Sequence, residues 1–206
     1  TRRQPFSFRI LGNDLPSLVV DRPGQLDPFL APLVPLDALL QYRPDGSDQH
    51  RVRIRGVVTL HRPGEVLILQ NGPLGVKIRP AVSADASVGD EIEAAGFVSR
   101  GGYTAELQDT VFRVLGHPGP PAPQRLSQSP FAGNLQAPDL DQKLVQLQAT
   151  VTALRHHSAE LVLQLETDGF LFPATLVQPP ERLPRGLQPG CRIELAGIAE
   201  VRLSDR

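Results

Sequence analysis

The 206-residue sequence contains no tryptophan, no methionine and a single cysteine, Cys191. One cysteine excludes a disulfide within the chain and a zinc site built from several cysteines, so we expect Cys191 to be a packed thiol. Aromatic residues make up only 5% of the chain. The stacking platforms that single-stranded nucleic acid requires are therefore scarce.

A strong charge of one sign and a long apolar run are also missing. The 21 basic and 22 acidic side chains leave a net charge of −1, so no overall field attracts polyanions. No run approaches the roughly 18 consecutive apolar residues of a membrane-spanning helix. The first residues show neither a signal peptide nor an initiating methionine, and we expect a piece of a longer protein.

The sequence lacks the motifs of common catalytic sites: a glycine-rich phosphate loop, a nucleophile elbow, a metal-binding His/Glu helix and a cysteine pair. His156 and His157 are adjacent, which favours a solvated hairpin tip over a metal site, because neighbours in a strand point to opposite faces. Glu93 and Glu194 alternate with isoleucines, which favours an exposed or cross-strand role on the outer face over catalysis. We expect no enzyme activity, no metal and no cofactor.

Proline is abundant, at 21 residues, about twice the usual share. The prolines gather in residues 22–35, 116–123 and 178–189, with β-like segments between them. Val52 and Ile54 alternate with arginines, which predicts a strand with one buried face.

An internal repeat divides the chain. VRIRGVVT at 52–59 aligns with VQLQATVT at 145–152, and Gln70 of the next strand aligns with Gln164. GDEIEAAG at 89–96 and GCRIELAG at 190–197 are identical at five of eight positions. The first glycine of each octapeptide predicts a tight turn with positive φ, and the last predicts a bend or bulge within a strand.

Short strands with a connection between the third and the fourth describe an OB-like barrel. We predict an all-β chain of two tandem OB-like five-stranded β-barrels with short helices at 35–42 and 124–131. The predicted domains are an N-terminal extension at 1–35, a first barrel at 36–116, a Pro-rich linker at 117–123 and a second barrel at 124–206. Residues 6–20 resemble a fifth strand, which we expect to complete the second barrel in cis or in trans.

The runs VRIRGVVTLHRPGEVLILQNGPLGVKI, GDEIEAAGFV and VFRVLG resemble a module of the extracytoplasmic regions of bacterial membrane-anchored signalling proteins, chiefly sensor histidine kinases. The resemblance covers residues 36–116 well and 124–200 more loosely. It departs from the module's pattern at Asn71, Pro73 and Leu74, and at Ala149, which stands in place of a glycine. It implies a non-catalytic, periplasmic sensor or interaction region of a transmembrane receptor, with membrane contact only through other segments.

OB barrels commonly bind ligands across the second and third strands and the adjoining loops. The residues at these positions of the first repeat form a basic rim with one aromatic, which suits a small anion or an acidic protein partner. This predicted ligand face comprises Arg62, Gln70, Lys77, Arg79, Arg100 and Tyr103.

In the second repeat, Phe170 and Phe172 predict contacts with other domains of the receptor. Two alternatives remain open: an OB-fold protein that binds single-stranded nucleic acid, and a structural spacer domain. The balanced charge and the few aromatics make nucleic acid the less favoured partner. Salt-sensitive binding to single strands would identify the first alternative, and the lack of any ligand the second.

Overall fold

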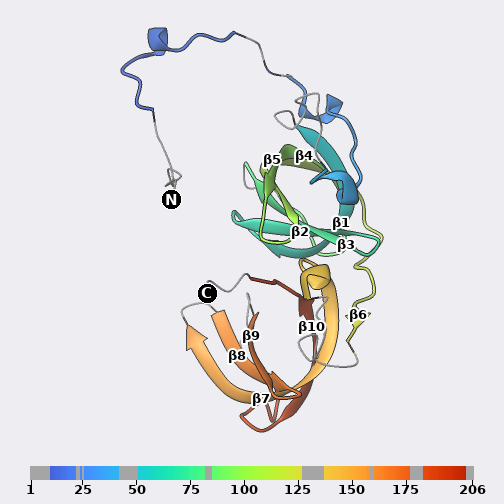
Figure 1. Cartoon of the computed structure of the whole chain (residues 1–206). Helices are drawn as coiled ribbons and strands as arrows, with labels where there is room; N and C mark the ends of the chain where they lie inside the picture. The colour runs from blue at the N-terminus through green and yellow to red at the C-terminus, as the bar shows by residue number, and fades with distance from the viewer. Residues whose placement is uncertain are drawn as a thin grey trace.

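A computed structural model describes residues 10–21, 24, 26–41, 51–81, 85–126, 137–157, 160–176 and 183–202, with the backbone alone at position 157. Two β-rich units lie one against the other (Figure 1). No helix within these ranges is long and apolar enough to cross a membrane. The prediction of an all-β chain is confirmed.

The first unit contains five strands: β1 (Val52–Arg62), β2 (Val66–Asn71), β3 (Leu74–Pro80), β4 (Glu91–Arg100) and β5 (Ala105–Gly116). They close into a barrel in the order β1-β2-β3-β5-β4. β3 and β5 run parallel, and the other neighbours run antiparallel. This closed five-stranded barrel is OB-like, as the sequence predicts.

Alternation along the strands builds the barrel core. Ile54, Val58 and Leu107 are fully buried inside it. An arm before β1 adds Val34, whose backbone N–H donates to the Arg53 carbonyl at 2.7 Å. The arm contains short 3-10 turns, η2 (Pro28–Leu30) and η3 (Leu36–Ala38), and η1 (Leu15–Ser17) lies before it. The helix predicted at 35–42 is therefore a single 3-10 turn within the described residues.

The second unit contains β7 (Leu144–His157), β8 (Glu160–Thr167), β9 (Phe170–Leu176) and β10 (Arg192–Ile198), preceded by η5 (Ala137–Leu140). Their order, β10-β7-β8-β9, repeats the order β4-β1-β2-β3 of the barrel. β6 (Gln124–Arg125) pairs with β7, so residues 124–125 are a strand and not the predicted helix. Residues 127–131 of that helix lie outside the described ranges.

The second unit is an open sheet over its described residues, whereas we predicted a closed barrel. No described strand joins β9 to β10, the place that β5 takes between β3 and β4 in the first unit. Local alternation predicts strands, but closure depends on a long-range partner that the pattern of each strand does not specify.

The strand registers agree with most of the repeat. Val52 lies opposite Gly96 in the first unit, and Val145 lies opposite Gly197 in the second. Gly89 and Gly190 have φ of 96° and 91°. The positive φ predicted at the turn before β4 and β10 is confirmed.

The repeat alignment of the second strand is wrong by two residues. Val58 lies opposite Leu69 and Val151 opposite Leu165, so Gln70 corresponds to Glu166 and not to Gln164. Three residue pairs follow the β-bulge in the β1–β2 hairpin and five follow it in the β7–β8 hairpin. The β7–β8 hairpin is therefore longer by two residue pairs, which moves the matched positions of β8 by two residues. Residue identity alone does not show this shift.

Gly96 and Gly197 occupy matched positions but have different surroundings. A Cβ at Gly96 would lie 2.5 Å from Thr110 Oγ1 and 2.9 Å from the Gln108 carbonyl oxygen, both on β5. A Cβ at Gly197 would meet nothing within 4 Å. The close approach of β5 therefore requires glycine at position 96.

We expect Gly96→Ala to destabilise the barrel by about 1–3 kcal/mol, because an added methyl group must push β5 away. Gly197→Ala is the matched control and should change the free energy of unfolding of the monomer by less than about 0.5 kcal/mol. Urea unfolding of both variants measures the difference. Equal losses would contradict the different surroundings of the two glycines.

Residues 10–20 pair with neither sheet and run away from the barrel (Figure 1). Their apolar side chains are exposed: Ile10 by 83%, Leu11 by 76% and Val19 by 86%. The strand predicted at 6–20 is therefore not docked on the second sheet of the same chain over residues 10–20. Residues 6–9 lie outside the described ranges.

Candidate functional site on the outer face of β2 and β3

The predicted ligand face lies on the outside of β2 and β3. Val76 and Ile78 point into the barrel core, so the alternating residues Gly75, Lys77 and Arg79 lie on the outer face. The register places Gln70 opposite Gly75 on this face. The site thus has the position at which OB folds bind their ligands.

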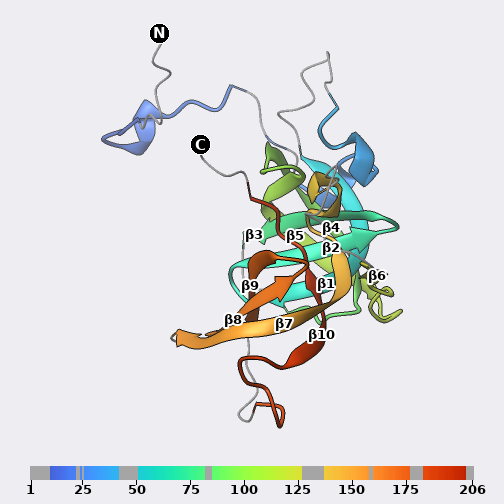
Figure 2. The same cartoon turned by 60° about the horizontal axis from the view of Figure 1, so that its bottom comes forward.

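The second unit covers much of this face. Lys77 Nζ donates to Glu200 Oε1 at 2.8 Å, and Gln70 Oε1 accepts from the Leu144 backbone N–H at 3.0 Å. Arg62, at the end of β1, forms an ion pair with Glu160 at the start of β8. Figure 2 shows the same two units turned by 60°. Three of the six predicted ligand residues therefore contact the second unit.

The two backbones come closest at Gly75. A Cβ there would lie 1.8 Å from the carbonyl oxygen of Gln142, which is closer than any side chain allows. No left-handed φ is recorded for Gly75, so the close approach alone requires glycine. Ile68 is only 2% exposed although it lies on the outer face opposite Lys77, as expected for a covered surface.

Asp141 joins three segments at the edge of this interface. One carboxylate oxygen accepts from Thr104 Oγ1 at 2.8 Å, and the other accepts from the Val201 backbone N–H at 2.9 Å. Asp141 is 3% exposed. It therefore ties the loop after β4 and the segment after β10 to the turn before β7.

A small cleft remains beside these contacts, between β3, the loop after β4 and the segment after β10. Its walls carry both charges, and Lys77 within it also lies 3.7 Å from Glu106. The cleft is lined by Lys77, Gly102, Thr104, Glu106, Asp141, Gln142, Glu200, Val201 and Arg202.

The charges at the interface are mutually compensated. The hydrogen bond from Lys77 holds the pKa of Glu200 below its usual range, with Arg202 assisting, although burial opposes this shift. Glu200 is therefore ionised at neutral pH and pairs with a lysine whose side chain is 15% exposed. Such partly exposed ion pairs contribute modestly to stability. The Lys77–Glu200 pair therefore orients the two units relative to each other more than it strengthens their binding.

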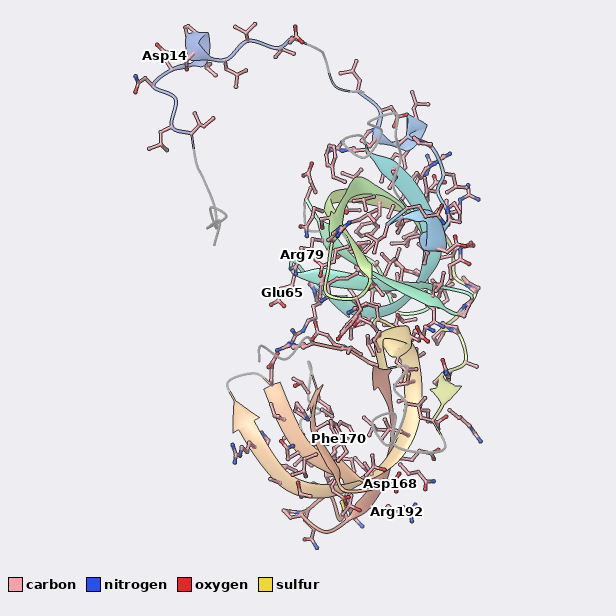
Figure 3. All side chains as sticks on the ribbon, viewed as in Figure 1. Asp14, Glu65, Arg79, Asp168, Phe170 and Arg192 are labelled. Atoms are coloured by element: carbon pink, nitrogen blue, oxygen red, sulfur yellow. The ribbon has the colours of Figure 1, made fainter. Side chains whose placement is uncertain are left out.

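The remaining predicted residues lie at the rim. Arg79 forms an ion pair with Glu106 at 3.3 Å within the barrel, and Figure 3 labels it at the left edge of the first barrel. Arg100 is exposed, and Tyr103 is 37% exposed. The structure thus does not bring the six residues together into one open pocket.

Sequence reasoning missed the residues that make the interface: Gly75, Thr104 and Asp141. A glycine inside a strand can mark a close backbone approach, and this signal was available at Gly75. Nothing local distinguishes Asp141 from any other carboxylate in a turn, because its partners are 37 and 60 residues away along the chain.

Glu93 has the predicted cross-strand role but is completely buried on the outer face of β4. It accepts from Arg55 at 2.9 Å and from Arg113 at 2.6 and 2.9 Å, and Arg53 lies 3.4 Å away. Arg113 also lies over the ring of Phe29 in the N-terminal arm. The cluster joins β1, β4, β5 and the arm.

Burial by itself would raise the pKa of Glu93. Hydrogen bonds from Arg55 and Arg113 and the charge of Arg53 outweigh burial and hold the pKa of Glu93 below its usual range. These partners make Glu93 a structural anion and leave it poorly suited to be a general acid.

The two phenylalanines of β9 differ in their surroundings. Their rings stack at 6.4 Å, but Phe172 packs against the core of its own sheet, whereas Phe170 is 37% exposed. Phe172 thus adds to the core of the second sheet, and contacts of these phenylalanines with other domains stay a prediction. Cys191 is half-buried and packs against the same core, as expected.

The histidines do not form a metal centre within the described residues, where no group of three or more His, Cys, Asp or Glu side chains could hold an ion. His156 is exposed, and the side chain of His157 is not described. His61 Nδ1 lies 2.7 Å from the Ala86 carbonyl oxygen, and His117 Nδ1 lies 2.5 Å from Asp90 Oδ1.

Comparisons with known proteins give limited likenesses. No family model matches the chain, and no curated protein matches it. A solved structure of U. maydis replication protein A bound to ssDNA is 27% identical, with 41% of this chain and 72% of that chain covered and a TM-score of 0.31.

Two further solved structures are similar over parts of the chain. A putative aspartyl-tRNA synthetase from Leishmania major Friedlin is 19% identical, with 50% of this chain but 25% of that chain covered, at a TM-score of 0.35. A murine DNA binding protein bound with ds DNA is 10% identical, with 75% and 99% covered, at a TM-score of 0.31. These TM-scores are too low to carry an inference from those proteins to this chain.

Proposed function

We propose that this region is a non-catalytic interaction and spacer module, in which the OB-type face of the first barrel holds the second unit of the same chain. One observation carries the proposal: the backbone of Gln142 lies against Gly75, in the middle of that face. A free ligand and the second unit cannot occupy this position together.

The contacts around Gly75 are those of a specific interface. Gln70 on β2 accepts a hydrogen bond from the Leu144 backbone N–H, and Lys77 on the neighbouring strand β3 pairs with Glu200. At the edge of the interface, Asp141 accepts a hydrogen bond from Thr104 of the first unit. Directional polar contacts around a close backbone approach hold two units in one orientation, which is what a spacer requires.

The corresponding outer face of the second unit is not basic. By register, Glu166, Gln164 and Val162 on β8 face Leu171, Pro173 and Thr175 on β9. Along these two fully described strands there is no lysine or arginine. A face that is neutral to acidic, with Leu171 57% exposed, suits a protein partner better than a phosphate backbone.

Single-stranded nucleic acid is the second candidate, and the barrel topology favours it, because OB folds commonly bind single strands. On this chain the basic face is covered, and Phe97 is overlain by Arg51 at 5.0 Å. The spacer proposal therefore comes first.

Fluorescence anisotropy with a 20-nucleotide oligo(dT) separates the two functions. We expect no binding by the 206-residue chain below about 10 µM at 50 mM salt, since nonspecific phosphate binding requires an accessible cluster of cations. Binding below 1 µM that weakens steeply with added salt would overturn the spacer proposal. The Gly75→Ala variant is the matched comparison, because it should uncover Arg62 and Lys77 and bind more tightly than the wild type.

Placement of this module in the periplasmic part of a transmembrane receptor stays a prediction from the resemblance to sensor histidine kinases. Within such a receptor, the two units would transmit force or set distance between other domains. A small anion or an acidic protein at the exposed rim residues, Arg79, Arg100 and Tyr103, also stays a prediction.

A further inference from the structure

The second sheet lacks the strand that closes the first barrel. In the first unit, β5 runs antiparallel to β4 and parallel to β3. In the second unit no described strand lies between β10 and β9, the counterparts of β4 and β3. Unpaired strand edges bind further strands readily, because their backbone N–H and C=O groups lack partners.

The inner face of the second sheet is partly open beside this gap. Four inward-facing residues of β3 and β4 are buried in the first barrel: Val76, Ile78, Ile92 and Ala94. Their counterparts by register pack on the core of the second sheet but are only half-buried: Phe172, Ala174, Ile193 and Leu195. In the first barrel β5 covers these positions, because Leu107 lies opposite Ile78 and Phe112 lies opposite Ala94. The uncovered apolar surface therefore lies where a fifth strand would pack.

Gly197 lies within β10 at the position matched to Gly96. Glycine is required at 96 because β5 crosses it between Gln108 and Thr110. Gly197 has open space around its Cβ position and no left-handed φ, so no described part of the chain requires glycine there. A strand that follows the course of β5 would require it.

Glu194 lacks the cation that its counterpart receives from the fifth strand. Glu93 lies opposite Arg113 of β5 and pairs with it at 2.6 Å. Glu194 is exposed and accepts from Gln146 at 2.8 Å, and no cation pairs with it among the described residues. An arginine or lysine on a fifth strand, at the place of Arg113, would supply the missing charge.

The chain that leaves β10 does not turn back toward the gap over its described residues. In the first unit, a tight turn at residues 101–104 leads β4 into β5. After β10, the Val201 backbone N–H donates to Asp141, and Glu200 pairs with Lys77 of the first barrel. Residues 199–202 are thus held at the interface between the two units, which favours a fifth strand from another protein.

We propose that the gap between β9 and β10 binds an extended segment of a partner protein as the fifth strand, antiparallel to β10 and parallel to β9. The pattern of β5 specifies the segment: one apolar side chain faces Ala174, a second faces Leu195 five positions later, and a cation follows directly and faces Glu194. A small residue passes over Gly197. The proposal goes beyond the spacer function and uses a different surface from the outer face of β2 and β3.

A labelled peptide with the sequence of residues 104–116, TAELQDTVFRVLG, is the probe, because β5 has the required pattern. Fluorescence anisotropy with the full chain should show saturable binding with a Kd below about 100 µM, since ordering a peptide offsets part of its interaction energy. Gly197→Ala should weaken binding at least about tenfold, because its methyl group meets the crossing strand. Gly116→Ala, also with an open Cβ position, is the control and should bind normally. No saturable binding by the wild type would overturn the proposal.

A charge exchange tests the register of the bound strand. Glu194→Lys should weaken binding of the same peptide at least about tenfold, because like charges would then face each other. A peptide that carries Arg113→Glu should bind the Glu194→Lys chain within about threefold of the original affinity. An exchange that fails to restore binding would show that the strand does not take the place of β5.

Hydrogen exchange identifies the occupant of the gap. The peptide should slow exchange in β9 and β10 and leave β3 and β4 unchanged. Exchange in β10 that is already as slow as in β4 at about 1 µM, without peptide, would mean that the same chain fills the gap. Protection that rises with chain concentration would identify a second copy instead, and either result would overturn binding of a partner. Gly75→Ala should bind the peptide normally, which separates this outcome from a failure of the spacer function.

Discussion

Glu93→Ala is expected to lower the free energy of unfolding of the first barrel by about 3 kcal/mol. The carboxylate is completely buried and joins arginines from β1 and β5. Removing one member of a buried ion cluster leaves the others uncompensated, which typically costs about 3–5 kcal/mol. The lower end applies because the side chains of Arg55 and Arg113 are 47% and 53% exposed and can turn toward water.

Urea unfolding of the full chain, followed at the first barrel, measures this loss. Glu194→Ala is the matched control, since the same repeat position on β10 is exposed, and it should change stability by less than about 0.5 kcal/mol. A loss at Glu93 no larger than that at Glu194 would contradict the role assigned to the cluster.

The pH dependence follows from the lowered pKa of Glu93. The unfolded chain binds this proton near the ordinary value of 4.5, whereas the folded barrel binds it at a lower pH. The contribution to stability is therefore fully present above pH 4.5 and is lost as the pH falls through the folded pKa. Glu93→Gln should remove this component of acid sensitivity in unfolding curves recorded between pH 3 and 7.

Gly75→Ala is expected to separate the two units without unfolding the barrel. The new methyl carbon would lie 1.8 Å from the Gln142 carbonyl oxygen, and a backbone cannot yield as a flexible side chain can. The alanine itself fits a strand, so the barrel has no reason to unfold. The Leu144 amide should lose its hydrogen-exchange protection, because its acceptor is Gln70 across the interface.

X-ray scattering supplies the second measurement for this variant, with an expected increase in the radius of gyration. Gly116→Ala is the control, because nothing lies within 4 Å of its Cβ position and its φ is not left-handed. Unchanged protection of Leu144 in Gly75→Ala would show that the two units do not bind through this face.

The sequence by itself determined the strands and their repeat. Alternation at Val52, Ile54 and the arginines is a local property with period two, and it survives whatever packs outside. The turn glycines, Gly89 and Gly190, were predictable because a positive φ is a backbone requirement of the residue itself.

Only the tertiary structure decided which outer faces are covered. Lys77 and Arg79 have the same polar, outward positions in the pattern, yet the second unit covers one and leaves the other at the rim. Glu93 and Glu194 match in sequence, yet one is buried among arginines and the other is exposed. Burial of an outward residue depends on partners that lie tens of residues away, and alternation along a single strand carries no information about them.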